Sequence, residues 1–393
     1  MARLSALIAS TAVFLAFNML AAPFGLSRGP RLPEKALRCN RVFFGDVLPP
    51  DATLEKVAVV REGGSYGEGE ANVAYSVDPT GLPAFLYNFP VTDPKHLSVA
   101  DTALIADEVI RQCDLADGVQ DGIVSTPDRC APELTVLLCS GKDNGAKNAP
   151  TSGKADCLRP AQLETARNVY SDWTLPPNNE LLHPGLTFSS EGEWLLILNG
   201  SEPVPYGIGY ARDFLFDDDG GGGGGGSGSD APPWDWRTSF NESVVRYADE
   251  HDPGNATADD CAALGAVRER GGKVVIYHGL ADGLVPTKGT GVYWNRTLDA
   301  LGGLGGLGGL EDFMRLFLVP GMGHCYGTAV DAPWNFGGAF QAGLIGSGVW
   351  SVPGFEDAEH DALMALVDWV EKGKPLDSIV ATTWEDPTNS SSG

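Results

Sequence analysis

The sequence predicts an α/β fold, and two stretches in the second half of the chain carry most of that prediction. Lys273–Pro286, KVVIYHGLADGLVP, is an apolar strand followed by a turn that contains Asp282. Arg315–Cys325, RLFLVPGMGHC, repeats this arrangement with a Pro-Gly turn and then His324. In open α/β sheets, reacting groups collect in the loops at the carboxyl ends of the strands. An acid and then a histidine on two successive strand ends form the second half of a Ser–Asp–His order.

Asp282 and His324 are therefore the candidate catalytic acid and base. In such a triad the histidine takes a proton from a serine, while the acid fixes the histidine tautomer and stabilises the imidazolium. A single strand-end Asp is usually a turn former and a single His is usually structural, but their occurrence on successive strand ends favours chemistry. His278 is expected to shape the turn or to contact a ligand rather than to act as the base.

The charge balance limits the kinds of partner that the protein can have. The 393 residues include 27 Lys and Arg against 52 Asp and Glu, which gives a net charge of −25. Nucleic acid and anionic membrane surfaces would be repelled, so neither is expected as a partner. The length leaves room for roughly two or three compact units.

The N-terminus is typical of a secretory signal peptide. Arg3 precedes an apolar run from Leu7 to Leu20, and Ala21 and Ala22 follow. We therefore expect residues 1–22 to be a signal peptide and the protein to be secreted. No other segment has the roughly 20 apolar residues that a membrane span needs. A secreted glycoprotein is also favoured by five Asn-x-Ser/Thr sequons, at Asn199, Asn241, Asn255, Asn295 and Asn389.

Residues 23–90 are predicted to be the β-rich first part of the α/β domain, because short apolar runs alternate there with Gly and Pro. From Pro94 the pattern changes, and Ser98–Gln112 has the period of an amphipathic helix. Ser98 is the expected N-cap and Asp101 follows three residues later. The apolar face is expected to consist of Val99, Ala103, Ala106 and Ile110.

Seven cysteines in an exported protein predict disulfides with one sulfur left over. Their spacing favours the pairs Cys113–Cys130 and Cys139–Cys157. Left without an obvious partner are Cys39, Cys261 and Cys325. Both pairs fall in a loop-rich second domain, predicted at 91–270, which includes a disordered Gly-rich run at 217–230.

The third region, predicted at 271–382, contains the two strand ends and is preceded by a helix at Ala262–Arg270. LGGLGGLGGL, at Leu301–Leu310, is expected to be a surface loop. A last helix should end at Gly373. One face of that helix is expected to carry Leu363, Val367 and Val370. A polar tail follows at 383–393.

An acidic loop, CDLADGVQDGI, brings Asp114, Asp117 and Asp121 within eight residues of one another. Carboxylates so close together repel unless a hard cation neutralises them, and Ca²⁺ accepts six to eight oxygens, including backbone carbonyls. Val119 and Ile123 could supply carbonyls, with their side chains turned to the core. The spacing does not match an EF-hand. A calcium site and a solvated acidic turn stapled by Cys113–Cys130 therefore both remain open.

Gly63–Gly67 contains the G-x-S-x-G pattern of a nucleophile elbow around Ser65. Such an elbow needs a strand before it and a helix after it. Val57–Val60 could be the strand, but Glu68-Gly69-Glu70 is a poor helix start. A β-hairpin turn is therefore favoured, and Ser65 is not favoured as the nucleophile.

These motifs together resemble the tannase/feruloyl esterase family of secreted serine esterases. The resemblance covers Pro94 to about Thr382, with a weaker match from Cys39 to Leu82. It rests on HGLADGLVP, RLFLVPGMGHC, CDLADGVQDGI followed by Cys130, and ALVDWVEKGKP.

The resemblance implies an α/β-hydrolase core into which residues 91–270 are inserted as a lid. It implies that Asp282 and His324 are the acid and base of a catalytic triad. The substrates would be esters of phenolic acids of the feruloyl or galloyl type, either small or linked to polysaccharide. Ser65 would lie in the family's leading β-segment, well before the nucleophile. The implied Ca²⁺ site is formed by Asp114, Asp117, Val119, Asp121 and Ile123.

One family motif is missing from this sequence. The family's nucleophile lies in Gly-Cys-Ser-x-Gly-Gly, which does not occur here. The sequence passes from Phe85 almost directly to the helix at Ser98, so on the order of a hundred residues of the hydrolase core are expected to be missing, since one βαβ unit alone takes about 30. By the resemblance, Cys325 would pair with the cysteine beside the nucleophile, and Cys39 with another cysteine of that segment.

Two functions follow from this pattern. The first is a secreted carboxylic ester hydrolase that works by a Ser–Asp–His mechanism, with a nucleophile that cannot be identified in this sequence. The second is a truncated, non-catalytic, calcium-binding secreted protein of the same ancestry. The presence or absence of the nucleophile segment in the natural protein distinguishes them.

Overall fold

A computed structural model describes residues 88, 92–139, 157–194, 208–209, 211–216, 235–251, 261–302, 309–327, 330, 334–337, 341, 352, 355 and 357–383. The chain divides into two compact units, Met1–Tyr75 and Ser76–Gly393, and all described residues belong to the second. The predictions for the signal peptide, Ser65, Cys39, the Gly-rich run at 217–230 and most of the Leu301–Leu310 insert therefore lie outside the described residues.

Two parallel strands form the part of the sheet that the described residues contain. β3 (Val274–Gly279) pairs with β4 (Met314–Val319) from Val274 opposite Met314 to Gly279 opposite Val319. The chain crosses between them through α11 (Thr287–Thr297) and the short π-helix η9 (Leu298–Gly302). This βαβ arrangement confirms the predicted α/β class and both predicted strands.

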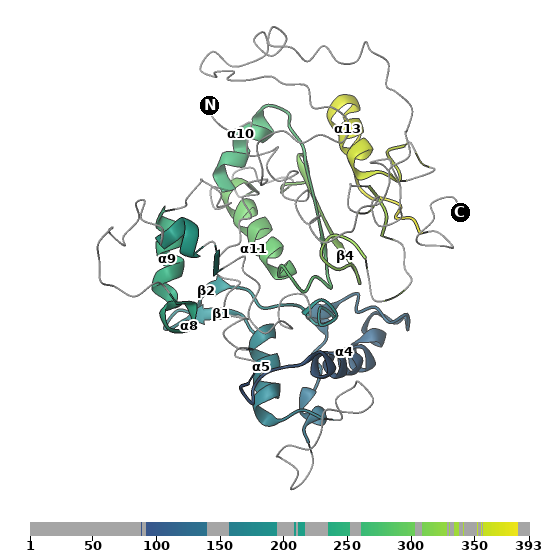
Figure 1. Cartoon of the computed structure of the whole chain (residues 1–393). Coiled ribbons are helices and arrows are strands. Elements are labelled where there is room, and N and C mark those ends of the chain that lie inside the picture. Colours follow the sequence, from purple (N-terminus) through teal and green to yellow (C-terminus); the bar gives the residue numbers. More distant parts are fainter. Residues whose placement is uncertain are drawn as a thin grey trace, which may run out of the picture. The chain divides into compact units, whose positions relative to one another are not determined.

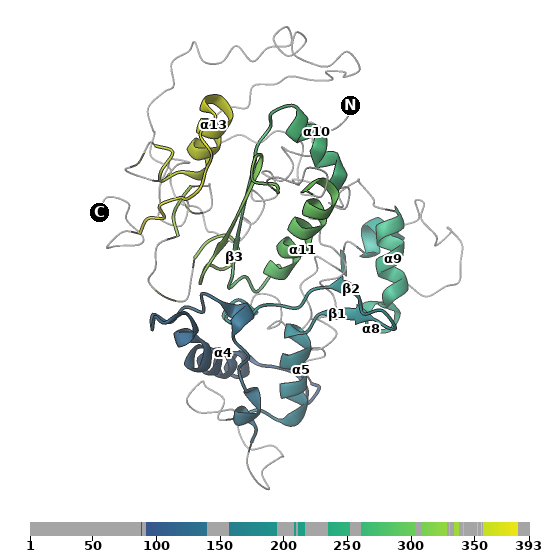
Figure 2. The same cartoon turned by 180° about the vertical axis from the view of Figure 1, so that it is seen from behind.

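Helices cover both faces of the β3–β4 pair (Figures 1 and 2). On one face, Val274 and Ile276 pack with Phe313 and with residues of α10 (Leu264–Glu269) and α11. On the other face, Val275 and Phe317 pack against α13 (Ala362–Lys372). Side chains of successive strand residues point to opposite faces, so a strand that is covered on both sides needs a continuous apolar run. The sequences VVIY and RLFLV have that character.

The helix α13 ends where the sequence predicted, but it buries a different face. Gly373, with a φ of +64°, closes it, and Asp361 caps its start by accepting from the backbone N–H groups of the next turn. Leu363 and Val370 are 66 % and 54 % exposed, so the predicted face is wrong. The buried face carries Ala365 and Trp369. The indole of Trp369 packs against the strands, and the guanidinium of Arg315 lies over its ring.

The helix α4 (Val99–Cys113) shows the same kind of correction. Ser98 and Asp101 form the predicted capping box. Val99 is exposed, and the buried stripe instead contains Ile105, Val109 and Cys113. The disulfide from Cys113 to Cys130 fixes the end of the helix against the core, which turns this stripe inward.

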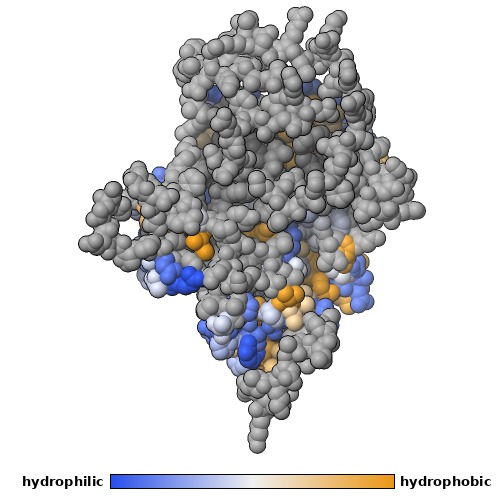
Figure 3. Space-filling view, in the orientation of Figure 1, coloured by the Kyte–Doolittle hydropathy of each residue, from blue (hydrophilic) through white to orange (hydrophobic). Residues whose placement is uncertain are grey.

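The rest of the region predicted as a lid is built from short elements around Trp194 and the buried face of α4. Both predicted disulfides, Cys113–Cys130 and Cys139–Cys157, are present. The surface around α4 and the next helix, α5 (Pro160–Tyr170), mixes hydrophobic and hydrophilic residues (Figure 3). The α-helices are α5 (Pro160–Tyr170), α8 (Trp236–Ser239) and α9 (Glu242–His251), and η7 (Ala211–Phe216) is a π-helix. Short 3₁₀ turns form η4 (Asp114–Asp117), η5 (Pro127–Arg129), η6 (Leu134–Leu137) and η8 (Cys261–Ala263). Two short strands, β1 (Trp173–Leu175) and β2 (Glu180–His183), pair antiparallel.

The segment after β2 contacts the loop that follows β3. The hydroxyl of Thr187 donates to the carbonyl of Leu280 at 2.6 Å. The ammonium of Lys288, at the start of α11, donates to the carbonyl of Tyr170 at 3.0 Å.

None of the helices that the structure describes has both the length and the apolar character needed to cross a bilayer.

Candidate functional site

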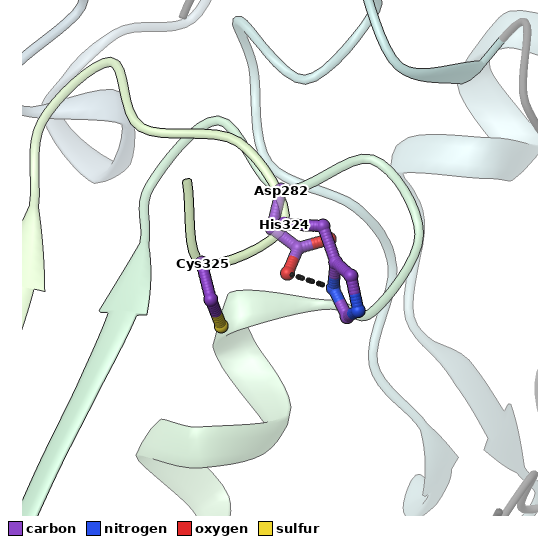
Figure 4. A group of neighbouring side chains, drawn as sticks. All are labelled: Asp282, His324 and Cys325. Carbon is purple, nitrogen blue, oxygen red and sulfur yellow. Dashed lines mark hydrogen bonds and ion pairs between the residues drawn. The ribbon is translucent and has the colours of Figure 1, made fainter. Parts of the chain in front are cut away.

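The structure places Asp282 and His324 together at the carboxyl ends of β3 and β4. Because the two strands end level with each other, their following turns leave the sheet at the same edge. The main chain joins the turns, since the N–H of Ala281 donates to the carbonyl of Met322 at 2.9 Å. The Nδ1 of His324 lies 2.9 Å from the Oδ2 of Asp282, and its ring faces that carboxylate (Figure 4).

Asp282 is fully buried and its charge is well stabilised. Its Oδ1 accepts the backbone N–H groups of Leu284 and Val285 at 2.9 and 2.8 Å. Burial alone would raise its pKa, but the hydrogen bonds and charges of His278 and His324 outweigh burial and hold the pKa below its usual range. Asp282 is therefore ionised at neutral pH.

The ionised carboxylate determines the tautomer of His324. A carboxylate can only accept, so the proton of the histidine lies on Nδ1 and Nε2 is the basic nitrogen. Burial lowers the pKa of His324, but its hydrogen bond to Asp282 and the charges of Asp282 and Glu193 raise it above the usual value. The side chain is 25 % exposed, so the pair combines a buried acid with a histidine that solvent can reach.

His278 is a third member of this group that the sequence did not assign. Its Nε2 lies 2.9 Å from the same oxygen, Oδ2 of Asp282, and its Nδ1 lies 2.6 Å from the Oγ1 of Thr290 on α11. A carboxylate can only accept, so Nε2 donates to Asp282. In the tautomer that carries its proton on Nε2, Nδ1 accepts the hydroxyl proton of Thr290. His278 therefore holds the carboxylate of Asp282 in place instead of contacting a ligand. The four-residue spacing His-x-x-x-Asp was the sequence signal for this contact.

Glu193, from the segment after β2, also reaches the site. Its carboxylate accepts the backbone N–H groups of His324 and Gly283, each at 3.0 Å. Burial raises the pKa of Glu193, and the backbone hydrogen bonds oppose that rise. No motif surrounds Glu193 in the sequence, so nothing local pointed to it.

Cys325 is buried beside the pair. Polar atoms of Asp282, His324 and Cys325 all lie within 4.8 Å of one another (Figure 4). Burial, with the charges of Asp282 and Glu193, raises the pKa of this thiol to about 12. The thiol is therefore protonated at neutral pH and is a poor nucleophile. Cys261 and Cys325 form no disulfide with any cysteine that the structure describes.

The acidic loop lies directly after α4 and the Cys113–Cys130 disulfide. Asp114 is buried, and its Oδ1 accepts the backbone N–H groups of Asp121 and Gly122 at 3.2 and 2.9 Å. Asp117 and Asp121 are exposed, and each accepts a backbone N–H two residues ahead. The side chain of Val119 is 55 % exposed, so the expectation that it turns to the core is wrong.

The donor set of this loop fits a hard cation. The Oδ2 atoms of Asp114 and Asp121 make no hydrogen bond with any described residue, and all available donors are oxygens. The three carboxylates do not converge to within 4.8 Å of one another among the residues described. The loop therefore offers oxygen ligands of the right chemistry, while its carboxylates stand apart in this structure.

The comparisons with known proteins agree with this geometry. The sequence profile described as "Tannase and feruloyl esterase" matches residues 86–198 and 232–391. Probable feruloyl esterase B-2 of Aspergillus terreus is 32 % identical over 307 residues, which are 75 % of this chain and 51 % of that protein. The chain spans about half the length of the curated relatives it matches.

Solved structures show the same fold. Feruloyl esterase B from Aspergillus oryzae superposes with a TM-score of 0.60 at 26 % identity, over 76 % of this chain and 53 % of that one. An esterase from Aspergillus oryzae gives the same TM-score and identity over 79 % and 54 %. The profile match covers well over half of this chain and includes both Asp282 and His324. The chain belongs to the tannase and feruloyl esterase family.

Proposed function

We propose that this protein is a carboxylic ester hydrolase that cleaves esters of phenolic acids. The observation that carries the proposal is the Asp282–His324 hydrogen bond at the ends of two adjacent parallel strands, in a chain of this family. The names of the matching relatives favour feruloyl or galloyl esters as substrates, either small or attached to polysaccharide.

In the proposed mechanism His324 is first the general base and then the general acid. Its Nε2 takes the proton of a serine hydroxyl as the serine attacks the ester carbonyl, and returns it to the leaving alcohol. Asp282 stays ionised, holds the proton on Nδ1 and stabilises the imidazolium. Backbone N–H groups stabilise the oxyanion, and water then releases the phenolic acid from the acyl-enzyme.

The serine is proposed to lie in a segment that enters between the positions of Phe85 and Ser98. Three facts support this placement: the sequence lacks Gly-Cys-Ser-x-Gly-Gly, the chain spans about half the length of its relatives, and Cys325 pairs with no described cysteine. The cysteine next to the serine would then pair with Cys325.

Secretion is proposed on the leader at residues 1–22 and on the sequons. Of the five sequon asparagines, Asn241 and Asn295 lie in the described part of the chain, and both are exposed. An exposed asparagine is accessible to a glycosyl group.

We further propose that the acidic loop binds a structural Ca²⁺. The carboxylates of Asp114, Asp117 and Asp121 and the carbonyls of Val119 and Ile123 would hold it. The proposal is supported by the all-oxygen set of possible ligands and by the hydrogen bonds that Asp114 accepts from the backbone at the other end of the loop. The ion would neutralise the three acids and stiffen the loop next to Cys113.

The experiment that tests the enzyme proposal combines an intact mass with an assay. The natural protein is purified from culture medium, deglycosylated and weighed, and its hydrolysis of methyl ferulate and methyl gallate is measured. A mass well above the 41.4 kDa of this chain, together with hydrolysis that Asp282→Asn and His324→Gln each remove, is expected. A mass no greater than that of the chain, without hydrolysis, would instead establish a truncated, non-catalytic protein.

A further inference from the structure

A single side chain outside the strand turns contacts both of them. The two carboxylate oxygens of Glu193 each lie 3.0 Å from the backbone nitrogen of His324, and Oε2 also lies 3.0 Å from that of Gly283. Gly283 directly follows Asp282 in the chain. Glu193 therefore accepts from the residue next to the acid and from the base itself.

Two glycines leave the space that this carboxylate occupies. A Cβ on Gly323 would collide with the Oε1 of Glu193. A Cβ on Gly283 would come within 2.8 Å of the Cβ of Glu193 and within 2.5 Å of the carbonyl of Ser190. The contact thus depends on small residues in both turns, next to Asp282 in one and next to His324 in the other.

The segment that carries Glu193 is firmly held. Trp194 is fully buried and its Nε1 donates to the hydroxyl of Ser190 at 3.0 Å, while that hydroxyl donates to the carbonyl of Thr187 at 2.6 Å. Thr187 in turn donates to Leu280 in the turn after β3. A side chain fixed in this way can hold a neighbouring group to a precise position.

Glu193 also adds a negative charge beside the histidine. Among the described residues, the charged groups that act on His324 are the carboxylates of Asp282 and Glu193. Cys325 lies close but keeps its proton, and His278 bonds to Asp282 and Thr290. Two carboxylates around one imidazole favour its protonated form. That form is the one produced when the histidine takes the serine proton.

We propose that Glu193 is a positioning residue, whose carboxylate fixes the backbone of Gly283 and His324 and so sets the alignment of the Asp282–His324 pair. The inference rests on the proposed function for its catalytic meaning, but its structural part can be measured without turnover. It also gives the lid-region segment a direct role in the active site.

The test compares three variants of the full chain. Glu193→Gln keeps the size of the side chain but removes the charge and exchanges one acceptor oxygen for an NH₂ donor. Glu193→Asp keeps the charge but is one methylene shorter. Glu191→Gln is the matched control, because Glu191 is a buried acid in the same segment that bonds to Tyr170 and Ser189 instead of the two turns.

The primary measurement is the NMR titration of His324 in ¹³C-histidine-labelled protein, together with the amide shifts of Gly283 and His324. In Glu193→Gln we expect a lower pKa of His324 than in the parent and a displaced amide proton for both residues. Glu193→Asp should displace the amides while keeping the histidine pKa nearer the parent value. Glu191→Gln should leave both measurements at the parent values.

Activity supplies the second measurement. We expect Glu193→Gln to lower kcat by about tenfold to a hundredfold through misalignment, with a smaller change in KM. The acid limb of kcat/KM should move to lower pH, and Glu193→Asp should recover part of kcat with the parent pH profile.

The two proposals fail in different ways. An unchanged His324 titration and unchanged amides in Glu193→Gln, or an equal change in Glu191→Gln, would overturn the positioning role whether or not the protein hydrolyses esters. Should Glu193→Gln not fold, unchanged amides of Gly283 and His324 in Glu193→Asp would overturn it as well. A displaced titration in a protein without hydrolysis would leave the positioning role standing and remove the proposed function.

Discussion

His278 and His324 approach the same oxygen of Asp282, each with a ring nitrogen 2.9 Å from Oδ2. His324 comes from the turn after β4 and is partly exposed, whereas His278 is the buried last-but-one residue of β3. In the proposed mechanism His324 transfers protons, whereas His278 holds the carboxylate of Asp282 in place through its hydrogen bond.

The first prediction concerns this holding role. His278→Phe keeps a ring in place but removes the donor to Asp282 and leaves the hydroxyl of Thr290 without its acceptor. We expect a loss of about 1–3 kcal/mol in the free energy of unfolding, because a buried charge loses a hydrogen bond. Urea unfolding near neutral pH measures this loss. Thr290→Val, which keeps the His278–Asp282 contact, should cost less; an equal cost would contradict the assigned role.

The second prediction concerns Glu191, which is buried and accepts from the hydroxyl of Tyr170 and the N–H of Ser189. Burial raises its pKa to about 7, above the value of 4.5 for a free side chain. Its contribution to stability is therefore fully present below the unfolded-state pKa and is lost as the pH rises through about 7.

Glu191→Gln, which cannot ionise, should consequently lose less stability than the parent protein between about pH 5 and about pH 8. Urea unfolding at several pH values measures the difference. Glu164→Gln, at an exposed position on α5, is the control and should follow the parent curve. Parallel curves for Glu191→Gln and the parent would show that Glu191 ionises normally.

The third prediction concerns the proposed calcium loop. Added Ca²⁺ should raise Tm, and a chelator should reverse the rise; at a hundredfold excess over Kd the gain is about 2.7 kcal/mol. Mg²⁺ should stabilise less, because it demands a smaller octahedral site. Asp117→Asn with Asp121→Asn should remove the response, while Asp128→Asn, another exposed acid nearby, should retain it. A response that survives the double substitution would place the ion elsewhere.

The fourth prediction separates the two disulfides, which close loops of similar length, with sequence separations of 17 and 18. Removing either pair by alanine substitution should cost about 3 kcal/mol by the loop-entropy estimate. Only the Cys113–Cys130 pair adjoins the acidic loop, since Asp114 follows Cys113. Calorimetric titration should therefore show weaker Ca²⁺ binding without Cys113–Cys130 and unchanged binding without Cys139–Cys157.

Much of the site could be predicted from the sequence because its elements are local. Apolar runs that end in Gly- and Asp-containing turns placed β3, β4, Asp282 and His324 correctly, and cysteine spacing gave both disulfides. The two helix faces were wrong because each helix has more than one apolar stripe of the right period. Tertiary packing chooses between them, through Cys113 in α4 and Trp369 in α13.

Glu193 could not be found from the sequence for a different reason. Its partner His324 lies 131 residues away, and a hydrogen bond to a backbone N–H requires no particular side chain at the partner. The spacing of His278 and Asp282 was visible, but turn formation explained it equally well until the distances were known.

The sequence separations within the site also bear on the order in which it folds. The Asp282–His324 contact closes 42 residues within one βαβ unit, whereas the Glu193–His324 contact closes 131. A threefold longer loop costs roughly 1 kcal/mol more entropy to close. We expect the Asp282–His324 contact to form early, as that unit collapses, and the hydrogen bonds to Glu193 to form afterwards. The contact from Glu193 is therefore expected to be among the last to form, because the site is assembled from contacts of such different range.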